Sequence, residues 1–335
     1  MSEVAPTIPE ALKAANSVAI LSHISPEADT LGSALALYLV LKDLGKDVAL
    51  YNADPIPPRY LFLPGAEKIV RASCIPHPFD LYLVLDSGDR RRVGGLLDDL
   101  PSGGAVINID HHQSNERFGD LNWVEPAASS TGEMIYRLLQ AMAVPISPEV
   151  ATNLYAAIHA DTGSFRFSNT TPSALRAAAD LLERGAKAGE VVEGLYEQQS
   201  VKALRFLGKI LLELERSEDG AIASFTIGSS ELKAAGIEME ETDGFINYPR
   251  SLKGVKVALA FKELSPGLVK VSLRSKGQVD VAKIASVFRG GGHQNAAGCI
   301  LSGGLGEVKE RVLAEVRRAL NGLRPERPRT ASFHG

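Results

Sequence analysis

Acidic and imidazole side chains recur in this chain at the ends of short apolar runs. His23 closes one such run, Asp86 follows another, and Asp110-His111-His112 follows a third. The full set of candidates is His23, Glu27, Asp29, Asp86, Asp110, His111, His112 and Asp161. So many acids would repel one another unless cations lay among them. Mixed imidazole and carboxylate ligands suit Mn²⁺ or a similar divalent ion, and their number indicates a two-metal site, the kind that activates water.

Each of these residues also has a purely structural explanation when it is taken alone. Asp29, for example, could cap a helix that begins near Leu31. Acid or histidine residues at several neighbouring strand and helix ends favour the metal site over a series of unrelated caps.

Glycine-rich segments form a second group of candidates. In Gly290-Gly-Gly-His293, three glycines allow close approach of a ligand to the backbone, and His293 adds a donor. The alternative is a plain flexible loop between a helix and a strand. Gly32 and Ser33 give a weaker signal for a loop-to-helix turn that meets a phosphate.

The elements that must position these residues alternate between strand and helix in the first half of the chain. Compact apolar runs predict strands, and helical spacing predicts a helix over Leu31–Leu44. The strands are expected at Val18–Ser22, Asp47–Tyr51, Leu81–Leu85 and Ala105–Ile109, and further helices at Ser130–Ala143, Pro148–Ala160 and Pro172–Arg184. Such runs between helices indicate a buried, mostly parallel sheet, whose carboxyl edge binds ligands.

The second half reads as a smaller α/β domain after a helical connector. Strands are expected at Ala221–Ile227, Val255–Phe261 and Leu268–Arg274, with helices at Val281–Phe288 and Glu307–Leu320. The predicted division is a metal-binding domain over 1–187, a helical connector over 188–217, a substrate-binding domain with a mixed sheet over 218–322, and a disordered tail over 323–335.

Composition and charge exclude several classes of protein. The 335 residues are 45% hydrophobic and 23% charged, which indicates a globular chain, and no apolar run is long enough to span a membrane. Two cysteines and no visible secretory signal predict a cytoplasmic location. The net charge of -4 argues against a protein that coats duplex DNA, yet residues 245–300 carry nine Lys or Arg against two acids. This basic segment suggests a small anionic partner, or else a solvated lysine-rich face.

Five motifs taken together resemble a known family. HISPEADTLGS, LVLDSGD, NIDHHQSN, AAIHADTGSFRFSN and GGGHQNAAG are similar to the ordered motifs of the DHH phosphoesterases that carry a DHH-associated C-terminal domain. In size, the chain resembles members of the bacterial nanoRNase subgroup. These are oligoribonucleases that also dephosphorylate 3′-phosphoadenosine 5′-phosphate (pAp).

The resemblance implies roles for the matching positions. His23 and Glu27 would hold one Mn²⁺, Asp29, His111 and Asp161 the other, and Asp86 would bridge both. Catalysis would rest on Asp86, Asp110 and His112, with His112 facing the scissile phosphate and Asp110 orienting the histidines. Arg274, Gly291, Gly292 and His293 would bind the substrate. A hydroxide held between the two metals would attack phosphorus.

One position departs from the family pattern. The usual Pro-Asp-x-Asp reads Pro26-Glu27-Ala28-Asp29 here, which leaves the occupancy of the His23/Glu27 metal site open.

The expected substrates are short single-stranded RNA or DNA oligonucleotides and pAp. Alternatives are a cyclic or linear dinucleotide phosphodiesterase, a single-strand exonuclease of DNA repair and a non-catalytic nucleotide-binding regulator. The choice between monomer and homodimer also stays open.

Overall fold

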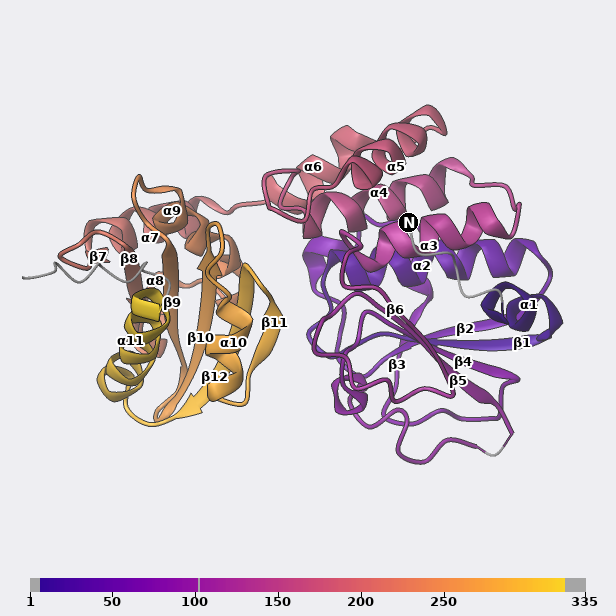
Figure 1. Cartoon of the computed structure of the whole chain (residues 1–335), viewed down its shortest axis with the longest axis horizontal. Helices are drawn as coiled ribbons and strands as arrows, with labels where there is room; N and C mark the ends of the chain where they lie inside the picture. Colours follow the sequence, from indigo (N-terminus) through magenta and orange to yellow (C-terminus); the bar gives the residue numbers. More distant parts are fainter. Residues whose placement is uncertain (1–6, 102, 323–335) are drawn as a thin grey trace, which may run out of the picture. The chain divides into compact units, whose positions relative to one another are not determined.

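The computed structural model describes residues 7–101 and 103–322, and the chain divides into two compact units, 1–198 and 199–335 (Figure 1). The predicted tail, 323–335, lies outside the described residues.

The first unit is built on a parallel sheet. Its strands are β1 (Ser17–Leu21), β2 (Asp47–Asn52), β3 (Ile69–Arg71), β4 (Leu81–Leu85), β5 (Ala105–Asp110) and β6 (Leu121–Val124). They lie in the order β3-β2-β1-β4-β5-β6, and every neighbouring pair is parallel. The predicted mostly parallel sheet is therefore confirmed, while the short edge strands β3 and β6 were not expected.

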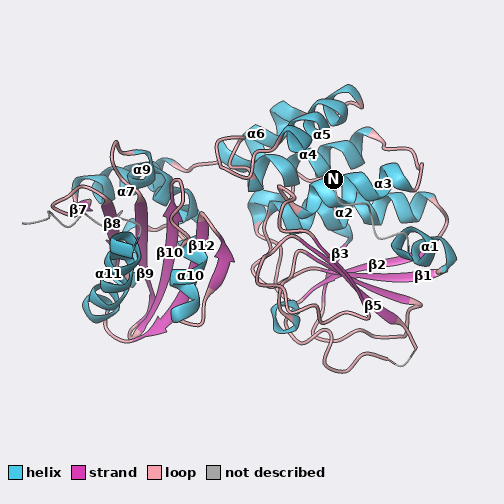
Figure 2. Cartoon of the chain, viewed as in Figure 1, coloured by secondary structure: helices cyan, strands magenta, loops and turns pink. Residues whose placement is uncertain are grey.

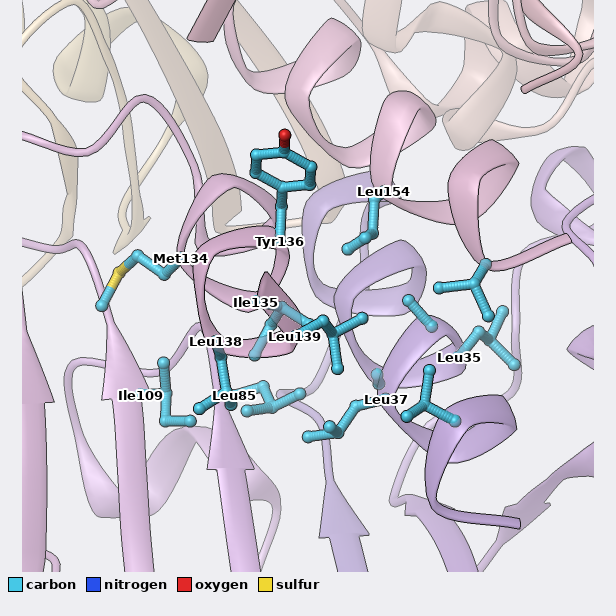
Figure 3. Close-up of a cluster of buried hydrophobic side chains, with 14 of the residues drawn as sticks. Leu35, Leu37, Leu85, Ile109, Met134, Ile135, Tyr136, Leu138, Leu139 and Leu154 are labelled. Carbon is cyan, nitrogen blue, oxygen red and sulfur yellow. The ribbon is translucent and has the colours of Figure 1, made fainter. Parts of the chain in front are cut away.

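Helices cover one face of this sheet (Figure 2). The unit contains α1 (Thr7–Ala14), α2 (Ala28–Asp43), α3 (Thr131–Ala141), α4 (Pro148–Asp161), α5 (Pro172–Glu183) and α6 (Ala188–Tyr196), with 3₁₀ turns η1 (Pro58–Tyr60), η2 (Ala66–Lys68) and η3 (Arg90–Val93). Leu85 and Ile109 of the strands face Leu37 of α2 and Leu139 of α3, and all four side chains are fully buried (Figure 3). This apolar layer fixes α2, α3 and α4 against the strands whose ends carry the candidate ligands.

Side-chain caps set the start of several helices. Ser130, Ser147 and Thr171 each accept the backbone N–H three residues on, at the start of α3, α4 and α5. Helix α2 begins differently, at Ala28 rather than near Leu31, and its N-cap residue Glu27 makes no side-chain cap hydrogen bond. The reading of Asp29 as the cap of this helix is therefore wrong.

The second unit has a mixed sheet, as expected. Its strands are β7 (Glu215–Arg216), β8 (Ile222–Ile227), β9 (Val257–Ser265), β10 (Leu268–Ser275), β11 (Gly291–His293) and β12 (Ala296–Ser302), in the order β11-β12-β10-β9-β8-β7. Strands β8 and β9 are parallel, and the other pairs are antiparallel. Helices α10 (Val281–Val287) and α11 (Leu305–Gly322) pack on one face, and α7 (Val201–Leu212), α8 (Ser229–Ala235) and the 3₁₀ helix η4 (Met239–Ile246) on the other, with α9 (Asn247–Ser251) alongside.

The predicted connector 188–217 is divided between the two units. Val191 of α6 belongs to the core of the first unit, whereas Phe206 and Ile210 of α7 belong to a core of the second. The helices are separated by residues 197–200. The exact domain limits stay a prediction. Among the described helices, none combines the length and the apolar character needed to cross a membrane.

Candidate metal centre

The candidate ligands of the first unit gather where the parallel strands end. His23 lies two residues after β1, Asp86 follows β4 directly, and Asp110 is the last residue of β5. The chain turns sharply after β4, because Asp86 has a φ of 57°, a conformation that Asp tolerates better than most residues. Because neighbouring parallel strands end at the same edge, these side chains come together although they are far apart in the sequence.

Asp86 lies at the centre of three imidazoles. Its Oδ2 is 3.5 Å from His23 Nε2, and its Oδ1 is 3.6 Å from His111 Nε2 and 3.7 Å from His112 Nδ1. Burial opposes ionisation of this carboxyl, but the three imidazoles outweigh it and hold the pKa of Asp86 well below its usual value. Asp86 is therefore an ionised carboxylate with imidazoles on several sides.

A second set of carboxylates surrounds His111. Its Nε2 lies 3.5 Å from Asp29 Oδ2 and 3.7 Å from Asp161 Oδ2. Burial opposes protonation of His111, yet the carboxylates, Asp161 foremost, raise its pKa to about 9. Burial also raises the pKa of Asp161 to about 7 and that of Asp29 well above its usual value. The raised pKa values of Asp161 and Asp29 indicate that the imidazoles alone do not stabilise all of these carboxyl groups in their ionised form.

The ring orientation of two histidines suits metal binding. His23 Nδ1 lies 2.7 Å from the carbonyl oxygen of Ile24, and His111 Nδ1 lies 3.2 Å from that of Ala128. A carbonyl oxygen only accepts hydrogen bonds, so both rings carry a proton on Nδ1 and direct Nε2 at the carboxylates. His23 Nε2 is buried and makes no hydrogen bond with any described residue. A divalent cation bound by Nε2 and the carboxylates fits this donor set.

Three sets that lie wholly within the first unit hold groups close enough to share an ion. Within each set, one ligand atom per residue lies within 4.8 Å of the others. The sets are His23/Glu27/Asp86, Asp29/His111/Asp161 and Asp86/Asp110/His112. All eight sequence candidates are thus brought together on this edge of the sheet. Glu27 is the exposed member of the first set and keeps its carboxylate near His23 despite its extra methylene.

His112 is held by a chain of hydrogen bonds. Its Nδ1–H donates to Asp110 Oδ1 at 2.7 Å, and Asp110 Oδ2 accepts from Asn115 Nδ2 at 2.6 Å. Burial of Asp110 opposes its ionisation, but His112 lowers the pKa of this carboxyl below its usual value. Asp110 therefore stays ionised and fixes the imidazole of His112.

Several supporting residues were missed in the sequence. The hydroxyls of Thr30 and Thr131 donate to the two oxygens of Asp86, and Asn169 Nδ2 donates to Asp161 Oδ2 at 3.2 Å. Thr30 stands beside Asp29 in the sequence, and Asn115 and Asn169 lie in the motifs NIDHHQSN and AAIHADTGSFRFSN. These motif positions were the only sequence signal for Thr30, Asn115 and Asn169, whereas Thr131 lies in none of the motifs.

Asp29 has a structural task as well. Its two oxygens accept the backbone N–H groups of Thr131 and Gly132, both at 2.8 Å, at the start of α3. It thus caps a helix about 100 residues further along the chain, and the same carboxylate faces His111.

The second unit brings two of the predicted substrate-binding residues into one row. On β12, Ala296 pairs with His293 of β11 on one side and with Arg274 of β10 on the other. Directly opposed residues of antiparallel strands point to the same face, so Arg274 and His293 share a face with only an alanine between them.

The glycines beside His293 have two different explanations. Gly290 and Gly292 are required by packing, because a Cβ there would lie 2.3 Å from Gly298 O and 2.4 Å from Ala296 O. A Cβ on Gly291 would meet nothing within 4 Å. The segment is an edge strand rather than a flexible loop, and of these three glycines Gly291 leaves the most room for a ligand.

Fold and cluster together define a metal-binding α/β protein with a separate mixed-sheet unit. Residues 17–158 match the N-terminal domain of the DHH family, and residues 221–322 match the DHHA1 domain. The bifunctional oligoribonuclease and PAP phosphatase NrnA of Thermus thermophilus is 38% identical over 316 residues, 93% of each chain. The protein of the same name from Bacillus subtilis is 29% identical over 299 residues, 88% of this chain and 91% of the relative. A solved exopolyphosphatase-related protein from Bacteroides fragilis matches with a TM-score of 0.83 and 26% identity over 94% of this chain and 95% of that one.

The chain belongs to the DHH family, with a DHHA1 domain as its second unit. It is therefore a hydrolase of phosphoric esters, and the acid and histidine clusters provide the metal-binding groups on which this family depends.

Proposed function

We propose that this protein is a Mn²⁺-dependent exoribonuclease that degrades short oligonucleotides to mononucleotides and also removes the 3′-phosphate of pAp. The observation that carries the proposal is the position of Asp86, an ionised carboxylate within 3.7 Å of His23, His111 and His112. The identity to NrnA-named relatives over nearly the whole chain supports the choice of substrates.

The residues of the cluster suit two cations with one shared ligand. His23 and Glu27 would hold the first, and Asp29, His111 and Asp161 the second. Asp86 would be shared, because its two oxygens face His23 and His111. When bound, divalent cations lower the pKa of water and offset negative charge on phosphoryl oxygens. The hydroxyls of Thr30 and Thr131 fix the shared carboxylate, so little reorganisation is needed when the substrate arrives.

His112 is placed to act on the phosphate itself. Because Asp110 accepts the hydrogen bond from Nδ1–H at 2.7 Å, the ring is fixed, and its other nitrogen, Nε2, points away from Asp110. We assign His112 the role of donating a hydrogen bond to the phosphoryl group through Nε2. Asn115 keeps Asp110 in place for this task.

The second unit would supply substrate selection. Arg274 and His293 lie on one face of its sheet, and a guanidinium can hold a phosphate with two parallel hydrogen bonds or stack on a base. Contacts to the part of the substrate that does not react give specificity without taking part in bond cleavage.

The test is a product time course with RNA and DNA of graded short lengths, labelled at the 5′ or the 3′ end, and with pAp, in Mn²⁺ or Mg²⁺. Release of mononucleotides from one end in Mn²⁺, together with phosphate release from pAp, is the expected result. His112→Ala should lose turnover of every substrate, whereas His77→Ala, an exposed histidine outside the cluster, should behave as the wild type. If cyclic dinucleotides are cleaved and short RNA is not, the proposed substrate is wrong.

A further inference from the structure

Three consecutive arginines, followed by Val93, form the 3₁₀ turn η3 next to the metal centre in the first unit. Two of them have structural partners. Arg90 donates to the carbonyl oxygen of Leu97, and Arg91 donates from Nε to both carboxylate oxygens of Asp89, at 3.0 and 3.1 Å. The side chain of Arg91 is 81% exposed. In the described part of the chain, neither of these arginines forms a hydrogen bond or ion pair with a residue of the cluster.

Arg92 is different, because its guanidinium lies against a metal-site residue. Arg92 Nη2 is 3.3 Å from His23 Nδ1, but that nitrogen already donates to the carbonyl oxygen of Ile24 at 2.7 Å. Since Nδ1 carries the proton, it cannot accept a second one from Arg92. The half-buried guanidinium is therefore beside the His23 ring without a hydrogen bond to it.

Among the residues that the structure describes, no carboxylate lies within ion-pair distance of Arg92, and Asp89 acts on its charge only from further away. Ion pairs within 4.0 Å join Arg91 to Asp89 and Glu116, but none joins Arg92 to an acid. A half-buried cation without a paired anion is costly, unless an anion arrives with the ligand.

The main chain fixes Arg92 relative to His23. The N–H of Ile24 donates to the carbonyl oxygen of Arg92 at 2.7 Å, and the N–H of Arg92 donates to that of Asp89 at 3.1 Å. These bonds do not involve the side chain, so they remain when the guanidinium is removed. A substitution of Arg92 thus tests the charge and not the fold.

We propose that the Arg92 guanidinium binds a non-bridging oxygen of the phosphate that is cleaved, an inference that rests on the proposed function. The other side of the His23 ring presents Nε2 to Asp86 at 3.5 Å, so Arg92 and the metal ligands flank the same imidazole. A phosphate bound at the centre would lie on the Nε2 side of this ring, and the long Arg92 side chain would have to turn around the ring edge to meet it. There, the planar fork would oppose the charge on the phosphoryl oxygens. Arg92 is thus a catalytic residue supplied by the first unit alone.

The experiment compares Arg92→Ala and Arg92→Lys with Arg91→Ala, a neighbouring exposed arginine, as the matched control. Calorimetric titration gives the affinity of each protein for Mn²⁺, and then the affinity of the Mn²⁺-loaded protein for inorganic phosphate. Kinetics are measured on a dinucleotide and on bis(p-nitrophenyl) phosphate, which carries only one phosphate. We expect Arg92→Ala to bind Mn²⁺ as the wild type does, to bind phosphate more weakly, and to lose about 100-fold in kcat/KM on both substrates. Arg92→Lys should recover part of the loss, and Arg91→Ala should show none.

Three results would overturn the inference. They are unchanged phosphate binding in Arg92→Ala, a loss confined to the dinucleotide, or a loss of Mn²⁺ affinity that accounts for the lost activity. If the wild type cleaves neither substrate but binds phosphate through Arg92, the proposed function fails and the anion site stands.

Discussion

Replacing Asp86 by asparagine tests whether one carboxylate serves the whole centre. Asp86 lies within 3.7 Å of three imidazoles and accepts hydroxyl groups from Thr30 and Thr131. In Asp86→Asn the side chain keeps its shape and can still accept a hydroxyl, but its charge is lost. The variant should therefore fold, lose hydrolysis of every substrate, and lose the stabilisation that Mn²⁺ gives to the wild type.

The size of this stabilisation follows from mass action. A ligand present at 100 times its dissociation constant stabilises the folded state by about 2.7 kcal/mol. The unit that carries the centre has 198 residues, and in domains of this size 1 kcal/mol raises Tm by about 2–4 °C. Mn²⁺ should thus raise the Tm of the wild-type first unit by about 5–10 °C. In Asp86→Asn the shift should fall to less than about a third of that.

Differential scanning calorimetry with and without Mn²⁺ measures the shift, and steady-state kinetics measures activity. Glu67→Gln, which removes an exposed acid outside the cluster, is the control and should show the full wild-type shift. A folded Asp86→Asn protein that keeps the Mn²⁺ shift, or more than a few per cent of the activity, would refute the shared-ligand scheme.

Three further predictions address separate parts of the chain. Glu27→Ala should lower activity less than loss of Asp86, because Glu27 reaches only one cation set, while Glu27→Asp stays active; a dead Glu27→Asp in the same kinetic assay would contradict this. Arg274→Ala and His293→Ala should bind Mn²⁺ normally in calorimetric titration but lose most turnover of dinucleotides and pAp, and less of a small activated phosphodiester; equal losses on both substrate types would count against substrate selection by the second unit. Asp80 accepts hydrogen bonds from two backbone N–H groups where β1 begins, and these bonds lower the pKa of its carboxyl group. The ionised carboxylate therefore stabilises the fold above the ordinary carboxyl pKa, and this stabilisation is lost as pH falls through the lowered pKa. Urea unfolding at several acidic pH values should show a weaker pH dependence in Asp80→Asn, and an identical slope would contradict the assignment.

Buried strands were predictable from the sequence because their signal is local. The run Leu81–Leu85 is apolar throughout and is strand β4 with the same limits. The strand β6, Leu121–Val124, is short and has an asparagine within it, so its pattern is weak. Gly32 suggested a phosphate-binding turn, but it lies inside α2, where a Cβ would be 2.4 Å from the backbone oxygen of Asn153. That need for glycine comes from the contact of α2 with α4, which no local pattern records.

The candidate ligands were predictable because they stand at strand ends and in motifs, whereas their supports were not. Asp110 and His112 are two residues apart, and their pairing at 2.7 Å is a local event. Thr131 reaches Asp86 across 45 residues, and its hydroxyl could have served as an ordinary helix cap instead. Arg92 stood in a run of three arginines whose separate partners only the folded chain distinguishes.

The wide spacing of the ligands along the chain has a consequence for folding kinetics. The centre takes His23 from the loop after β1 and Asp161 from the end of α4, and the parallel strands between them pair only after long loops have closed. Non-local pairings of this kind form late, so a cation finds no ready site in the early chain. Bound metal should therefore leave the refolding rate nearly unchanged and slow the unfolding rate. The ion then stabilises the folded domain but not the transition state through which the domain folds.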